Sequence, residues 1–228
     1  MHAFILGVAV FTAIAGTARA QVAPDAVPCA LAQAAVFERF ISAECSACWT
    51  DAATPVAGSD AWLLDWIVPS ARGDQAPLSP AAPDEAAARA RRVLNTGVND
   101  NDARTTVHRT SARTTSAAKL TVASGPAFNG YFGVQIDGRG RAPVDSGVWV
   151  ALVESVPAGT DGTLVPRQLV RTVAGPFRPH ELGSGKAWRV LQAMRWPETA
   201  KPERLLARAW IERADGRLVA MAGERCAR

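Results

Sequence analysis

The sequence predicts an α/β amino-terminal half packed with an antiparallel, β-rich and sandwich-like carboxy-terminal half. Three observations predict it. Residues 35–41, AVFERFI, form an apolar run that leads into a Cys-x-x-Cys pair. Residues 83–95, PDEAAARARRVLN, have the composition and end signals of a helix. From residue 118 onward, short apolar segments alternate with Gly, Pro and Asp, which is typical of strands joined by turns.

The first twenty residues resemble a secretory signal peptide. Ala3 to Ala15 is almost wholly apolar, and Ala18 and Ala20 place small residues where a signal peptidase reads the chain. The apolar run is shorter than the roughly 20 residues that a membrane-spanning helix needs. We therefore expect cleavage after Ala20, a bacterial protein that is periplasmic or secreted, and no stable membrane span after cleavage. An uncleaved amino-terminal anchor is the alternative.

The next elements follow from local composition. Residues 35–41 and residues 61–68, AWLLDWIV, are apolar runs of strand length. The helix begins near Pro83, which suits a first turn, and Gly97 is its stop signal. Residues 99–116 are polar, and a short helix and an exposed loop both remain open for them.

The sequence of the second half predicts successive strands that end in a hairpin. Asp215-Gly216 lies between the apolar runs LLARAWIER and RLVAMAGE, and Asp-Gly between such runs is a strong hairpin signal. We place the boundaries at 1–20 for the signal peptide, 21–117 for the first half and 118–228 for the second.

Four cysteines, an even number in a chain expected to be exported, indicate disulfide bonds. Three pairings are possible. We favour Cys45–Cys48 with Cys29–Cys226, the second of which would close nearly the whole chain as one loop.

The Cys-x-x-Cys pair has several chemical interpretations. A strand that ends in this motif at the start of a helix is the thioredoxin arrangement, so we expect the first half to be thioredoxin-like. Backbone amides at the helix start would stabilise a thiolate on Cys45, and Cys48 would resolve a mixed disulfide. A c-type haem needs His where Trp49 stands, and tetrahedral zinc lacks two further ligands. We expect no cofactor, although a two-thiolate copper(I) site stays open.

Two further residues are candidates for supporting roles. Trp49 follows the pair directly and is the best of the seven tryptophans for a contact role. Asp65 is an acid inside an apolar run, and if it is buried beside the pair it would accept the proton of Cys48. The alternatives are packing for Trp49 and a water-facing position for Asp65.

The residues quoted above carry a resemblance to a family of uncharacterised exported bacterial proteins, domain-of-unknown-function family 1223. Its signature V-E-L-F-T-S-Q-G-C-S-S-C-P-P-A-D resembles VFERFISAECSACWTD, residues 36–51. Its later segments are similar to LLDWIV, the Arg-rich helix, VWVALVE and QLVRTVAGPF. The chain is identified as a distant and degenerate member, and the resemblance implies a thioredoxin-like first half.

The chain departs from this pattern in two places. Trp49-Thr50 replaces Pro-Pro after the second cysteine, and residues 91–97, RRVLNTG, lack the proline of the family's T-P-Q-M-V-V-N-G stretch. Two functions therefore stay open. One is an exported thiol–disulfide oxidoreductase that acts on a protein thiol or disulfide. The other is a non-catalytic binding or structural domain with an envelope partner, in which the disulfide is structural.

The scattered arginines argue against nucleic acid as a partner. Only three of the basic residues are lysines, and no aromatic residues interleave with a basic stripe. Nucleic-acid-binding surfaces usually cluster their positive charge. We therefore expect no nucleic acid.

Overall fold

The structure, a computed structural model, describes residues 35–96, 98, 104–111, 118–179, 182 and 187–224. Strands make up 49% and helices 14% of the structure. The predicted signal peptide, Cys29 and Cys226 lie outside the described residues. The elements follow in chain order: β1 (Ala35–Ser42), α1 (Ser46–Thr50), β2 (Ala61–Val68), η1 (Gly73–Gln75), η2 (Ser79–Ala81), α2 (Glu85–Leu94), β3 (Thr106–Ser111), β4 (Lys119–Ser124), β5 (Tyr131–Arg139), β6 (Ser146–Val156), β7 (Arg167–Phe177), β8 (Ala187–Arg195), η3 (Pro202–Arg204), β9 (Leu205–Arg213) and β10 (Leu218–Gly223).

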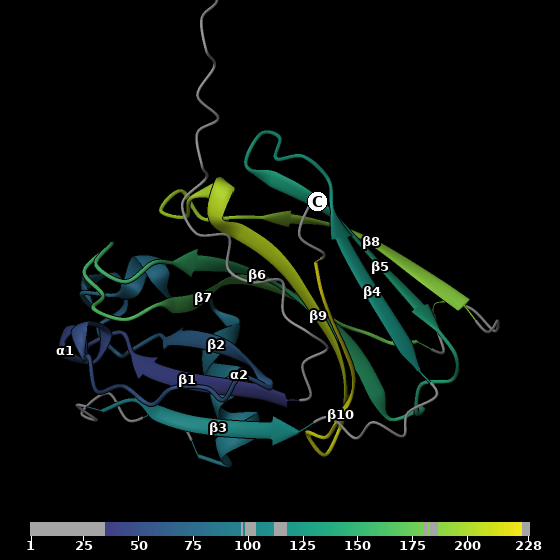
Figure 1. Cartoon of the computed structure of the whole chain (residues 1–228), viewed down its shortest axis with the longest axis horizontal. Helices are drawn as coiled ribbons and strands as arrows, with labels where there is room; N and C mark the ends of the chain where they lie inside the picture. Colours follow the sequence, from purple (N-terminus) through teal and green to yellow (C-terminus); the bar gives the residue numbers. More distant parts are fainter. Residues whose placement is uncertain are drawn as a thin grey trace, which may run out of the picture.

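Two sheets form the molecule (Figure 1). The large sheet has seven strands in the order β10-β9-β6-β7-β2-β1-β3, and the small sheet has three in the order β4-β5-β8. In the large sheet β1 and β2 are parallel, and β2 runs parallel to β7. All other pairs are antiparallel, which short turns can connect.

The prediction of a thioredoxin-like first half is wrong. The protein is mostly β, and its first three strands continue into β7, β6, β9 and β10 within one mixed sheet. Parallel strands are usually covered by helices on both faces. Here the described ranges contain two α-helices, α1 with five residues and α2 with ten. The parallel strands therefore have much less helical cover than a thioredoxin-like half would give them.

The local predictions for this region are nevertheless confirmed. Strands occupy the two apolar runs, and α2 lies within the predicted residues 83–95. The helix ends at Asn95, which adopts a left-handed backbone with φ of 57°. Residues 106–111 of the undecided polar segment form β3, which is one edge strand of the large sheet. The boundary proposed at residue 117 stays a prediction, since residues 112–117 are outside the described ranges.

The apolar side chains gather in three clusters. The first fills the space between the two sheets and includes Val134, Ile136 and Leu152. The second lies beneath α2 and includes Phe40 and Trp66. The third surrounds the cysteine pair. No helix in the described ranges combines the length and apolar character that crossing a bilayer requires.

Candidate functional site

The predicted Cys45–Cys48 disulfide is present. Cys45 caps the start of α1, and its Sγ accepts a hydrogen bond from the Cys48 amide at 3.2 Å. The bond therefore closes a single helical turn directly after β1. Because both sulfurs are in the disulfide, neither cysteine is a thiolate that could bind a metal ion.

Both cysteines are covered by other side chains. Cys45 is 8% exposed and Cys48 is 4% exposed. They belong to the cluster that also contains Ile41 and Ile67 of the two parallel strands and Leu169 of β7. Thiol exchange requires a sulfur of the partner to approach the disulfide directly. This packing restricts such an approach in the folded protein.

Trp49 is a packed side chain in this structure. It is 8% exposed, and its indole Nε1 donates a hydrogen bond to the backbone carbonyl of Asp161 at 2.8 Å. The carboxylate of Asp161 is in turn bound by Lys201 and Arg204 at 2.8 and 2.7 Å. Trp49 thus attaches α1 to the loop between β6 and β7.

Arg167 holds the other side of the disulfide turn. Its Nη2 donates to the carbonyls of Cys48 at 3.0 Å and Trp49 at 2.7 Å, and its guanidinium lies 5.1 Å from the centre of the Trp49 ring. These carbonyls belong to the end of α1, where a cation is favoured. Burial lowers the pKa of Arg167, while the nearby charge of Asp65 acts in the opposite direction. No feature of the sequence singled out this arginine.

Asp65 is fully buried and reaches the disulfide turn through Arg167. Arg39 binds both of its carboxylate oxygens, at 2.6 and 2.8 Å, and the amide of Gln168 donates to it at 2.7 Å. Arg167 lies 3.5 Å away. The water-facing alternative is therefore wrong. A carboxylate with a bidentate arginine is best suited to hold Arg39 and Arg167 in place.

A second buried charge centre lies beneath α2. Arg89 of α2 binds both oxygens of Glu38, at 2.8 and 2.9 Å, and one oxygen of Glu212 at 2.5 Å. The indole nitrogens of Trp66 and Trp210 donate to the same two carboxylates at 3.0 Å. The sequence analysis missed this centre. Its available signal was Glu38-Arg39, a charged pair inside the apolar run of β1.

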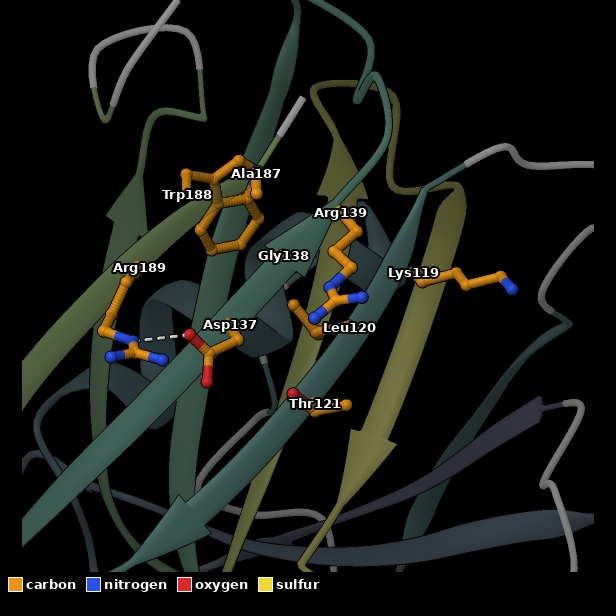
Figure 2. A pocket seen from close by; sticks show the side chains of 9 residues that line it. All are labelled: Lys119, Leu120, Thr121, Asp137, Gly138, Arg139, Ala187, Trp188 and Arg189. Atoms are coloured by element: carbon orange, nitrogen blue, oxygen red, sulfur yellow. Dashed lines mark hydrogen bonds and ion pairs between the residues drawn. The ribbon is translucent and has the colours of Figure 1, made fainter. Parts of the chain in front are cut away.

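The small sheet carries a pocket of about 410 Å³ (Figure 2). Its lining combines cationic side chains with the ring of one tryptophan. The lining residues are Lys119, Leu120 and Thr121 of β4, Asp137, Gly138 and Arg139 of β5, and Ala187, Trp188 and Arg189 of β8. Within the described ranges, no three His, Cys, Asp or Glu side chains are placed to hold a metal ion.

Comparisons with known proteins give little support for any assignment. No protein-family model and no curated protein matches the chain. Among solved structures, a β-glucosidase from Kluyveromyces marxianus in complex with glucose is similar at a TM-score of 0.27 and 8% identity. The match covers 50% of this chain and 14% of the β-glucosidase chain. A likeness this weak carries no argument about fold or activity.

Proposed function

We propose that this protein is a non-catalytic exported binding protein in which Cys45–Cys48 is a structural disulfide. The burial of both sulfurs carries the proposal, because an exchange-active pair needs an accessible attacking cysteine. In this proposal the chain is a divergent relative of family 1223 in which the cysteine pair has a structural role.

The contacts around the disulfide support a structural role. Arg167 binds two carbonyls of the turn, and Trp49 attaches it to Asp161. Catalytic thiol pairs usually lie in electropositive surroundings that partners can reach. Here the nearby positive charge of Arg167 faces backbone carbonyls and Asp65. The same cation therefore serves to hold the turn.

Ligand binding is assigned in this proposal to the small sheet. Its outer face exposes Tyr131 and Leu191, which are 45% and 73% exposed, and the adjoining turn exposes Phe128. The pocket of Figure 2 opens on the same sheet. Tyr131 and Phe128 lie at the end of the small sheet away from the pocket, and Leu191 lies between that end and the pocket, two positions after the lining residue Arg189. Exposed apolar side chains on a sheet that also carries a pocket are typical of binding surfaces.

A redox titration of the purified protein tests the structural role of the disulfide. Thiols are alkylated at each potential and counted by peptide mass spectrometry. We expect a reduction potential below about −300 mV, as is typical of structural disulfides. A value above about −250 mV, or turnover of a protein disulfide, would contradict the proposal.

Trp49→Ala sharpens this test, because it removes a large side chain that packs in the same cluster as the two cysteines. We expect dithiothreitol to reduce the folded variant about tenfold faster than the unaltered protein, since reduction depends on access. Trp188→Ala is the matched control, because Trp188 is 7% exposed and packs in the cluster between the two sheets, away from the disulfide. Equal acceleration in both variants would show that general destabilisation, and not access at Trp49, limits reduction.

A further inference from the structure

We propose that the pocket on the small sheet binds a small polar molecule that carries an oxyanion, either a carboxylate or a phosphate, through Lys119 and Arg139. This inference rests on the proposed function, because it names the ligand class of the binding surface assigned there. Three features of the pocket support it: an unbalanced pair of cations, an acid already occupied by another arginine, and a cavity of suitable size.

The two cations are direct neighbours across the sheet. In the register of β4 and β5, Lys119 stands opposite Arg139, and both are exposed. Like charges at directly opposed positions destabilise a sheet. Neither side chain forms an ion pair with another residue in the described part of the chain. In Figure 2 the ammonium of Lys119 points away from the guanidinium of Arg139. A bound anion would turn this repulsive pair into a favourable one.

The acid in the pocket does not neutralise them. Asp137 accepts a hydrogen bond from Arg189 at 2.6 Å and another from Gln135 at 2.7 Å. Figure 2 shows this pair on the β8 side of the pocket, apart from Lys119. The hydrogen bonds from Arg189 and Gln135 lower the pKa of Asp137, so it stays ionised and paired. Arg139 also attracts Asp137, more weakly than Arg189 does. The pocket thus has three cationic side chains, Lys119, Arg139 and Arg189, against one acid, so a net positive charge remains for a ligand.

The shape of the pocket depends on Gly138. A Cβ atom there would lie 2.0 Å from the ring of Trp188, so the indole lies directly against the backbone of β5. The two residues face each other in the register of β5 and β8. Trp188 is 7% exposed and packs in the core between the sheets, so this contact supports the backbone of β5 beneath the pocket. A cavity of about 410 Å³ is in the range of small-molecule sites.

Isothermal titration calorimetry at low salt distinguishes the two sources of the oxyanion. The probes are glucose 6-phosphate, glucuronate and uncharged glucose, so that the sugar scaffold is constant. We expect saturable binding of at least one of the two anions, weakening as salt is added, and none for glucose. No binding of either anion, or equal binding of glucose, would overturn the inference.

Two variants of equal charge test the location. Arg139→Gln should weaken anion binding by about tenfold or more, because it removes a charged hydrogen-bond donor. Arg195→Gln is the control, since Arg195 is exposed near the far end of the small sheet, opposite Tyr131. We expect its affinity to change less than about twofold. Equal losses in both variants would indicate diffuse attraction and would overturn the site.

Lys119→Gln gives a readout that needs no ligand. Removing one of two opposed cations should raise the melting temperature of the ligand-free protein by about 1 °C, while reducing anion binding. An unchanged or lower melting temperature would show that Lys119 and Arg139 do not repel each other measurably. These outcomes are independent of the redox titration. A buried, low-potential disulfide with no anion binding would leave the structural role standing and overturn only the ligand class.

Discussion

The core between the two sheets and the core beneath α2 are built on different principles. Between the sheets, aliphatic side chains such as Val134 and Leu152 pack with aromatic ones such as Phe132. Beneath α2, Arg89 lies buried between two carboxylates among Phe40 and Trp66. The difference teaches that the two cores should fail differently. An apolar core loses stability in proportion to the volume removed, whereas a buried ion cluster fails when one partner is lost.

The charged core depends on one arginine for two acids. Burial opposes the charge of Arg89, but the nearby Glu38 and Glu212 outweigh that cost and raise its pKa. One oxygen of Glu212 has no hydrogen-bond partner in the described part of the chain. Arg89 is therefore the residue on which the neutralisation of both acids depends.

Replacing Arg89 should produce the largest effect. Arg89→Met leaves Glu38 and Glu212 buried without a counter-ion, and we expect the free energy of unfolding to fall by about 3–5 kcal/mol. Urea denaturation measures it. Arg92→Met is the matched control on the same helix, because Arg92 stacks 4.5 Å from the Trp149 ring and has no acid partner in the described ranges. We expect it to cost about 1 kcal/mol. Similar losses in both variants would refute the special role of the charge cluster.

The apolar core should respond to volume alone. Leu152→Ala removes a side chain that is 1% exposed, and we expect a loss of about 3 kcal/mol from lost transfer energy and the cavity left behind. Leu191→Ala, at a position that is 73% exposed, should change stability by less than about 0.5 kcal/mol. Both follow from urea denaturation. A negligible loss at Leu152 would show that the two sheets pack loosely.

The smallest effect is expected at Arg208, a cation in an unusual position. It stacks 5.1 Å from the Trp62 ring and contacts Gln168, but it forms no ion pair with a described residue. Burial lowers the pKa of Arg208 to about 10. Arg208→Met should be neutral or should stabilise the protein by up to about 1 kcal/mol at pH 7, because a desolvated charge is removed.

The pH dependence of the Arg208 variant has a definite sign. The folded state releases the proton of Arg208 at a lower pH than the unfolded state, so wild-type stability rises, relative to the variant, as the pH increases above about 10. The advantage of Arg208→Met should therefore shrink between pH 9 and pH 11 in parallel urea titrations. A destabilised variant at pH 7 would show that the stacking on Trp62 outweighs the cost of burial.

Local pattern predicted the early elements, and distant pairing decided the fold. The apolar runs of β1 and β2 and the Cys-x-x-Cys pair were sufficient to predict two strands and a disulfide. The predicted fold class was wrong because it assumed that β1 and β2 pair only with elements of the first half. β2 lies between β1 and β7, and β7 comes about 100 residues later in the chain. Alternation within a strand does not specify such a distant partner.

The candidate site shows the same limit. Cys45 and Cys48 were predicted to bond, and they do. Trp49 packs in the same cluster as the cysteines, and the turn is held by Arg167, which comes from β7. Nothing in the segment VPRQLVR distinguishes Arg167 from the neighbouring Arg171 as the residue that reaches α1. The catalytic role of the pair stays a prediction.

The span of the Arg89–Glu212 contact has a consequence for biosynthesis. The two residues are 123 positions apart, and Asp65 is 103 positions from Gln168, whose amide it binds. Arg39 can pair with Asp65, and Arg89 with Glu38, early in the chain, but neither buried charge centre can be completed until β7 and then β9 have been made. Non-local contacts of this kind are slow to form and expose nascent strands to aggregation. We expect the nascent chain to rely on holding factors until its last strands are made.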